Sequence, residues 1–428
     1  MKGRVDHRQR RLAFARLFSS AVLSQALLSA ASFAIGLMLI RRTSDLQYGH
    51  YILAASAIAL LVSLQNAFCG PVLAARLGRL DLAGRARLVG ALLRERQAVV
   101  VGAGLAVIAA ALAWRATGAQ DGRGTALLLA GVAASLAILH RECLRLVLFA
   151  HRRPQDVLRT DLLYVVLMLA GVFAATRTGE AAVFAVAALG LAALASSALL
   201  SRALRRHEPW AQTAAPGLLR AVAPLAGWST AGAAMHWTFS QGYVYLVAAT
   251  LDVTAVAAIA ATRLLLMPVN LLSTGIGSLM LPLATGWLDR HGAALLRRRL
   301  ALFAAGMAAA TAVYFAVLWL EREWVFAVLL RKQFAQRDSL LLLWGVLFLV
   351  MVVRDQFAYL IAAQQRFRAL TLLTMASAGV SLVTSYAGMR QFGAPGALGG
   401  MLVGELISLG GILLLSRQPR RHGLAWAA

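Results

Sequence analysis

Residues 24–71 have the sequence SQALLSAASFAIGLMLIRRTSDLQYGHYILAASAIALLVSLQNAFCGP. Two long apolar runs fill most of this stretch, and only a short polar segment, RRTSD at residues 41–45, separates them. An α-helix rises about 1.5 Å per residue, so about 20 apolar residues cross a bilayer core roughly 30 Å thick. The stretch therefore predicts two membrane-spanning helices joined by a short turn.

The same pattern extends along the whole chain. Of its 428 residues, 60% are hydrophobic and 14% are charged, and the mean hydropathy is +0.73. A soluble protein cannot bury so much apolar surface, so these values exclude a soluble enzyme, a disulfide-rich scaffold and a disordered chain. We predict an all-α polytopic membrane protein with about 12 transmembrane helices. The apolar runs are 14–40, 48–68, 98–116, 125–150, 160–176, 181–201, 221–250, 253–282, 300–320, 340–363, 369–388 and 397–416.

Basic residues are distributed unevenly between the two sides of this topology. Most of the 42 Lys and Arg residues lie in the terminal segments and in every second loop. By the positive-inside rule, this asymmetry predicts an even number of spans with both termini in the cytoplasm, in a bacterial inner (plasma) membrane. Contact with anionic membrane lipids then accounts for much of the net charge of +25, and we expect no nucleic-acid partner.

The two halves of the chain show a weak internal repeat. Asp45 precedes the second run and Asp252 precedes the eighth, while Pro71 and Pro282 are expected to end those two helices. Repeats of six helices in the same orientation imply two lobes related by a pseudo-twofold axis along the membrane normal, with the substrate handled between them. We predict an N-terminal lobe of residues 1–206 and a C-terminal lobe of residues 207–428.

Three stretches resemble a known transporter family. Residues 24–71 contain an early glutamine, the turn YGHY at 48–51 and a closing proline; residues 257–292 contain MPVN at 267–270 and LP at 281–282; residues 141–154 are RECLRLVLFAHRRP. With 12 spans in two lobes, these stretches resemble the polysaccharide flippases of the multidrug/oligosaccharidyl-lipid/polysaccharide (MOP) export superfamily.

This resemblance implies a function and partners. It implies export or flipping of a polyprenyl-diphosphate-linked oligosaccharide by alternating access, for surface polysaccharide biosynthesis. The implied partners are that lipid-linked glycan, membrane lipids, a polysaccharide polymerase and glycosyltransferases. The alternative is an ion-coupled drug or metabolite antiporter, either like the multidrug (MATE) branch of the superfamily or of the major-facilitator type.

No motif in the sequence indicates an enzyme. There is no Walker A glycine loop, no HExxH and no CxxC, so we expect no direct use of ATP, no metal site and no cofactor. Cys69 and Cys143 both lie in apolar runs and are interpreted as buried thiols. A membrane-embedded polymerase or ligase is disfavoured because the longest predicted outer loop, 321–339, is short.

Arginines inside the apolar runs are the first candidates for substrate binding. An ionisable residue within a span is costly unless it is paired or hydrated, and a guanidinium can bind a diphosphate through two parallel hydrogen bonds. Arg263 lies near the middle of the eighth run and is the leading candidate; the alternatives are a structural pair with Glu405 or snorkelling. Arg145, Arg41 and Arg354 are expected to assist it.

These assisting arginines have structural interpretations too. Arg145 lies within one helical turn of Glu142, so the pair is expected either to receive a phosphorylated headgroup or to line the hydrated end of its helix. Arg41 ends the first run, where an interfacial anchor is the alternative. Arg354 and Asp355 point about 100° apart on a helix, so we expect them to contact different partners.

Neutral polar residues and a proline complete the candidate site. His236, Gln241, Gln25 and Asn66 are expected to contact sugars or, alternatively, neighbouring helices. Glu405, Asp355 and Glu142 are candidates for coupling or gating. Pro268 also belongs to that group, because it interrupts the eighth run and frees a carbonyl for which Asn270 is expected to compensate.

Overall fold

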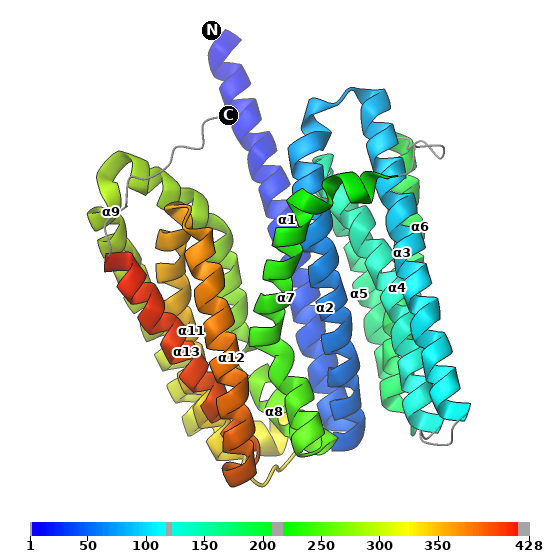
Figure 1. Cartoon of the computed structure of the whole chain (residues 1–428), viewed down its shortest axis with the longest axis vertical. Helices are drawn as coiled ribbons and strands as arrows, with labels where there is room; N and C mark the ends of the chain where they lie inside the picture. Colours follow the sequence, from blue (N-terminus) through cyan, green and yellow to red (C-terminus); the bar gives the residue numbers. More distant parts are fainter. Residues whose placement is uncertain (1, 117–121, 208–216, 418–428) are drawn as a thin grey trace. The chain divides into compact units, whose positions relative to one another are not determined.

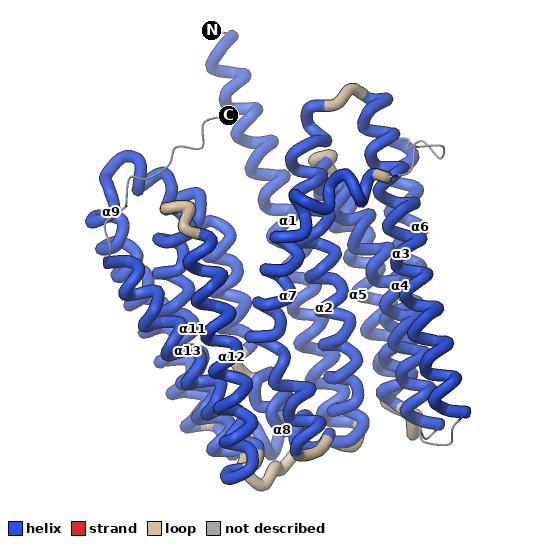
Figure 2. Tube along the Cα trace, in the orientation of Figure 1, coloured by secondary structure: helices blue, strands red, loops and turns tan. Residues whose placement is uncertain are grey.

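A computed structural model describes residues 2–116, 122–207 and 217–417, and these residues form helices joined by short loops, with no strand among them (Figure 2). The all-α polytopic prediction is confirmed. Residues 1 and 418–428, at the termini predicted to be cytoplasmic, lie outside the described residues.

The chain divides into two compact units, Met1–Trp237 and Thr238–Ala428. The dividing point falls inside helix α7, whereas the predicted lobes meet at residues 206 and 207; the lobes and their symmetry axis stay predictions. The helices of the first unit are α1 (Lys2–Arg42), α2 (Asp45–Arg76), α3 (Leu82–Ala116), α4 (Gly122–Ala150), α5 (Pro154–Ala175), α6 (Ala181–His207) and the first part of α7 (Leu218–Thr250).

Helices α4 and α6 form the centre of the first unit. Helix α4 packs against α2, α3 and α6, and α6 also contacts α5, which in turn packs against α1 (Figure 1). Cys69, Leu92, Cys143 and Leu200 are almost completely buried in the apolar core between these helices, and both thiols are free. The buried thiols of the sequence prediction are confirmed.

The second unit contains the remainder of α7 and the later helices. These are α8 (Val253–Leu264), α9 (Met267–Leu320), α10 (Arg322–Trp324), α11 (Arg337–Ala363), α12 (Phe367–Phe392) and α13 (Ala394–Arg417). Helix α9 consists of two arms, because Gly292 within it has the non-helical angles φ 76° and ψ 174°. Met280 and Ala284 of the first arm pack in one core with Leu296 and Leu300 of the second, so the chain folds back at this glycine (Figure 1).

A break interrupts the span predicted for residues 253–282. Helix α8 and the first arm of α9 meet at an angle of 59°, and Pro268 occupies the first turn of α9. The interruption at Pro268 is confirmed, but the expected compensation by Asn270 is wrong. The hydroxyl of Tyr314, from the second arm of α9, donates a 2.7 Å hydrogen bond to the carbonyl of Leu265, whereas Asn270 is exposed.

Each predicted apolar run lies in one helix or one arm of a helix, except 253–282, which is divided between α8 and the first arm of α9. Ten helices among the described residues are long and apolar enough to cross a membrane, and the bent α8–α9 pair makes an eleventh span. The remaining run, 221–250, lies in α7, which is long but carries more polar residues. The expectation that Pro71 and Pro282 end their helices is wrong. Each proline lies inside a helix that continues beyond it.

Small residues let α12 and α13 approach closely. A Cβ atom added to Gly388 would lie 2.6 Å from the carbonyl oxygen of Gly396, and one added to Gly400 would collide with the backbone of Ser385. The Ser385 hydroxyl also donates a 2.8 Å hydrogen bond to the carbonyl of Ala397. Close backbone contact and an interhelical hydrogen bond are the usual means of association between membrane helices.

Gly400→Ala is expected to destabilise the second unit by about 1–3 kcal/mol, because the new methyl group meets backbone atoms that cannot move aside. The neighbouring Gly399 faces open space, so Gly399→Ala should leave stability unchanged or raise it by up to about 1 kcal/mol. Thermal unfolding of both purified variants in detergent measures the difference. Equal melting temperatures would show that α12 and α13 are not in close contact at this point.

Candidate functional site

A network of four charged side chains lies inside the first unit. Arg141 and Arg145, on one face of α4, both bind Asp161 of α5, and Arg145 Nη2 lies 3.1 Å from the Asp161 carboxylate. Glu142 accepts from both arginines, at 2.5 Å from Arg141 and 2.6 Å from Arg145. The predicted contact of Glu142 with Arg145 is confirmed. Two positive and two negative groups therefore neutralise one another.

Neutral groups complete this network. The Ser24 hydroxyl of α1 donates to Asp161, and Arg145 donates to Ser24 over 3.2 Å. The guanidinium of Arg141 stacks 3.8 Å from the ring centre of Tyr164 and donates to Ser196 of α6. The network thus joins α1, α4, α5 and α6.

Asp161 is a functional candidate that the sequence analysis missed. Its side chain is fully buried. In the sequence it lies at the edge of the predicted run 160–176, so hydropathy does not indicate that it is inside the membrane. Helix α5 begins earlier, at Pro154, which places Asp161 two turns inside the helix. A proline followed by an acidic residue is a common start of a helix, and this signal at Pro154 and Asp156 could have placed Asp161 correctly.

A second missed group surrounds Arg96. Arg96 falls between the predicted apolar runs 48–68 and 98–116, but α3 begins at Leu82 and its Arg96 is only 5% exposed. Its Nε atom donates to the side-chain oxygen of Gln65 over 2.7 Å, and Gln65 in turn donates to the carbonyl of Leu139 over 2.9 Å. Within the described residues, Arg96 has no carboxylate partner, and its Nη2 atom is buried without a hydrogen bond.

Arg354 of α11 joins two carboxylates in the second unit. It binds Glu405 of α13, and its Nη2 atom lies 2.7 Å from the carboxylate of Asp355. Among the described residues, Arg354 and Asp355 share no third partner, in line with the expectation, but they also bind each other, because the long arginine side chain folds back onto its neighbour. Glu405 is only 4% exposed and pairs with Arg354 rather than with Arg263.

Arg263 has a different environment. Its Nη1 atom donates to the side-chain oxygen of Gln241 over 3.0 Å and to the hydroxyl of Tyr243 over 3.4 Å, both on α7. Its guanidinium lies 5.4 Å from the ring centre of Trp344 on α11. Within the described part of the chain, no carboxylate lies at ion-pair distance from Arg263. The structural pair with Glu405 considered from the sequence is not formed, and Arg263 binds Gln241 instead, a residue predicted to contact sugars or a neighbouring helix.

Four other predicted site residues belong to the first unit. His236 is exposed and belongs to the first unit, as do Gln25, Asn66 and Arg41. Gln25 is exposed next to buried Ser24, and the side-chain oxygen of Asn66 is buried without a hydrogen bond among the described residues. Arg41 is exposed at the end of α1. Their roles stay predictions, as do those of Arg145 and Arg354.

A side-chain cap stabilises the start of α8, the helix that carries Arg263. The Asp252 side chain caps α8 by accepting hydrogen bonds from the Ala255 amide over 2.6 Å and from the Thr254 hydroxyl over 2.7 Å. These bonds hold the pKa of Asp252 below its ordinary value, because they stabilise the carboxylate form. The described residues contain no group of three or more His, Cys, Asp or Glu that could hold a metal ion.

Comparison with known proteins gives a structural likeness alone. No protein-family model matches the sequence, and no curated protein matches it. A solved structure described as the inward-facing conformation of a multidrug resistance MATE family transporter of the MOP superfamily superimposes with a TM-score of 0.73, covering 93% of this chain and 97% of that one at 13% identity. This chain has a MATE-like fold.

Two further structures agree. An outward-facing multidrug resistance MATE family transporter gives a TM-score of 0.66 at 13% identity, covering 95% of this chain and 94% of that one. A MOP superfamily transporter from Pyrococcus furiosus, described by a reverse polarity of its binding pocket that suggests a different function, gives 0.63 at 13% identity with the same coverage. The likeness covers both units, so the fold prediction is confirmed, while the flippase branch is not shown by it.

Asp161→Asn is expected to destabilise the protein by about 3–5 kcal/mol, because it leaves Arg141 and Arg145 buried with a single carboxylate. Chemical or thermal unfolding of the purified variant measures the loss. The control is Glu180→Gln, which removes the exposed pair with Arg123 and should cost no more than about 1 kcal/mol. Equal stability of the two variants would mean that Asp161 does not hold the network together.

Asp252→Ala tests the cap of α8, and its effect should depend on pH. At neutral pH the variant is expected to lose about 0.5–2 kcal/mol. The folded pKa of Asp252 is lowered, so its contribution is fully present above the unfolded pKa of about 3.9 and is lost as the pH falls through the folded value. Melting temperatures of wild type and variant should therefore differ at pH 7, and the difference should begin to shrink only as the pH falls below about 4. A constant difference would contradict the charged cap.

Proposed function

We propose that this chain is a MATE-like secondary transporter of the bacterial inner membrane that exports an anionic amphiphile by alternating access, with both termini in the cytoplasm. The observation that carries the proposal is the environment of Arg263, whose contacts with Gln241, Tyr243 and Trp344 are all neutral. The fold likeness to transporters in inward-facing and outward-facing conformations supports the mechanism.

The charge balance favours an anionic substrate. The Arg141–Arg145 network has two carboxylates for two guanidinium groups, and Arg354 has two carboxylates of its own. A guanidinium at the centre of a membrane helix is unfavourable by about 2.5–3.5 kcal/mol, which an anion can offset through charge-assisted hydrogen bonds. Arg263, whose contacts among the described residues are all neutral, still has this capacity.

The first candidate substrate is a drug-sized or metabolite-sized anion. The solved structures that share the fold are described as multidrug resistance transporters, and this supports the antiporter alternative from the sequence analysis over the flippase. In such a site the amide of Gln241 and the ring of Trp344 would orient an aromatic or polar body while Arg263 binds its anionic group.

A lipid-linked oligosaccharide is the second candidate substrate. Its diphosphate would bind Arg263 through two parallel hydrogen bonds, and amide, hydroxyl and aromatic groups such as those of Gln241, Tyr243 and Trp344 suit contact with sugars. The resemblance of residues 24–71, 141–154 and 257–292 to polysaccharide flippases favours this candidate. Its polymerase and glycosyltransferase partners belong to the same proposal.

We assign coupling to the carboxylates that share an arginine. Glu405 on α13 and Asp355 on α11 both bind Arg354, so neutralising one of them by a proton or a cation would weaken the contact between the two helices. Glu142 has the equivalent position in the first unit, between Arg141 and Arg145. Pro268 supplies the bend at which α8 can change its angle.

Transport by proteoliposomes containing purified protein tests the proposal. Accumulation of a fluorescent anionic dye, an otherwise similar cationic dye and a fluorescent polyprenyl-diphosphate oligosaccharide would be followed under an imposed proton or sodium gradient. The anionic dye or the lipid-linked sugar should move faster than in protein-free vesicles. Arg263→Gln should slow that transport about 10-fold to 100-fold, the value of a charged hydrogen bond, and Arg263→Lys should restore part of it.

The matched control is Arg290→Gln, which removes the same charge from an exposed position on α9 in the same unit and should transport normally. Acceleration of the dye alone identifies the antiporter, and acceleration of the sugar alone identifies the flippase. Transport of the cationic dye only, or full activity of Arg263→Gln, would overturn the anion proposal.

A further inference from the structure

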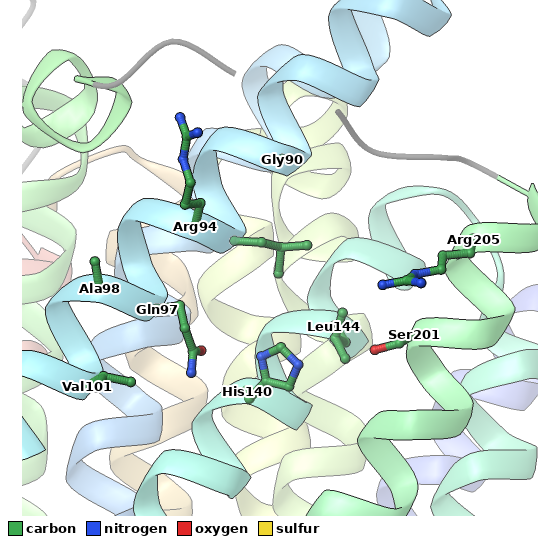
Figure 3. A pocket seen from close by; sticks show the side chains of 10 residues that line it. Gly90, Arg94, Gln97, Ala98, Val101, His140, Leu144, Ser201 and Arg205 are labelled. Carbon is green, nitrogen blue, oxygen red and sulfur yellow. The ribbon is translucent and has the colours of Figure 1, made fainter. Parts of the chain in front are cut away.

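A second candidate site lies entirely within the first unit. A cavity of about 570 Å³ opens between α3, α4 and α6, and its polar lining consists of Arg94, Gln97, His140, Ser201 and Arg205 (Figure 3). In Figure 3 the Arg205 side chain extends from α6 across the cavity, while His140 stands in it from α4. None of these residues takes part in the proposed transport site around Arg263.

The lining of the cavity changes from basic to apolar along the helices. Arg94 lies one turn before the predicted apolar run that begins at residue 98, and Arg205 lies one turn after the run that ends at residue 201. Ala98, Val101 and Leu144 line the cavity within the apolar part of their helices. The predicted boundary of the membrane therefore passes through the cavity, with the cations on the side of the basic loops.

One residue that lines the cavity carries a polar atom without a partner. The Nδ1 atom of His140 is buried and has no hydrogen-bond partner among the described residues. Gln97, also in the lining, accepts a 3.1 Å hydrogen bond from Nη1 of Arg96, which does not itself line the cavity. Buried polar atoms are satisfied in most proteins, so the unsatisfied atom of His140 supports the binding of a group in this cavity.

We infer that this cavity binds an anionic phospholipid, with the headgroup phosphate between Arg94 and Arg205 and an acyl chain along Ala98 and Val101. Basic pockets between transmembrane helices on the cytoplasmic side bind acidic headgroups, and the cytoplasmic leaflet supplies such lipids. A free phosphate would use the two arginines but not the apolar wall, whereas a phospholipid uses both. The bound lipid would stabilise the packing of α3, α4 and α6, since a ligand that binds only the folded state raises its stability.

Delipidated protein in a neutral detergent provides the test. Phosphatidylglycerol should raise the melting temperature and appear bound in native mass spectra, whereas phosphatidylcholine at the same concentration should have a smaller effect. The double variant Arg94→Gln, Arg205→Gln should weaken phosphatidylglycerol binding by about tenfold or more, because each arginine near an anionic lipid contributes appreciably to affinity. Equal binding of the two lipids to wild type would overturn the inference.

The matched control is Arg87→Gln, Arg206→Gln. These arginines are exposed on the same two helices, α3 and α6, and do not line the cavity, so the control loses the same charge. It should keep wild-type affinity for phosphatidylglycerol. An equal loss in the control would mean that the lipid responds to surface charge in general and not to this cavity.

Ala98→Trp separates a lipid from a free anion. The indole would fill the apolar part of the cavity while leaving both arginines in place, so phosphatidylglycerol binding should fall and any stabilisation by inorganic phosphate should persist. Stabilisation of the wild type by inorganic phosphate alone, with no response to phosphatidylglycerol, would overturn the lipid assignment.

Discussion

The free-energy cost of placing a guanidinium among membrane helices governs the interior of both units. Arg141 and Arg145 meet that cost with Glu142 and the fully buried Asp161, and the resulting network joins four helices. Because removing one member of such a network leaves an uncompensated charge, the arrangement of the helices and the pairing of the charges depend on each other. In the second unit the charge of Arg354 is likewise offset by two carboxylates, Asp355 and Glu405.

The positive charge of Arg263 is offset only in part by its neighbours. Gln241, Tyr243 and Trp344 provide dipoles and an aromatic face, which orient the guanidinium without neutralising it. An anionic ligand would complete this environment, and its binding would favour whichever conformation brings it closest to Arg263. A substrate shifts an alternating-access equilibrium only through such a difference in affinity between two states. The choice of an anionic substrate therefore rests on the incomplete neutralisation of Arg263.

The sequence predicted the helices well and the contacts of their polar residues poorly, for a physical reason. Hydropathy and length are local properties, so every apolar run is helical, although 253–282 is broken into α8 and the first arm of α9. Partner choice depends on neighbouring helices. Tyr314, distant in sequence, binds the Leu265 carbonyl at the break, while Asn270 is exposed, and the burial of Asp161 and Arg96 depended on helix starts that hydropathy placed too late. The pair of Glu142 and Arg145 was predictable because it lies within one helical turn.

The bend between α8 and α9 connects this electrostatic arrangement with motion. Arg263 lies in the last turn of α8, directly before the 59° break, while its neighbour Trp344 belongs to α11. Pro268 favours the break because it has no backbone N–H to donate. The Tyr314 hydroxyl stabilises the bent form by donating a hydrogen bond to the carbonyl of Leu265. Trp344 also donates a 3.1 Å hydrogen bond to the carbonyl of Ile259, one turn before Arg263 on α8. The proposed anion-binding arginine is therefore held next to the break by its own helix and by α11, so a change of helix angle at the break would change the surroundings of its guanidinium.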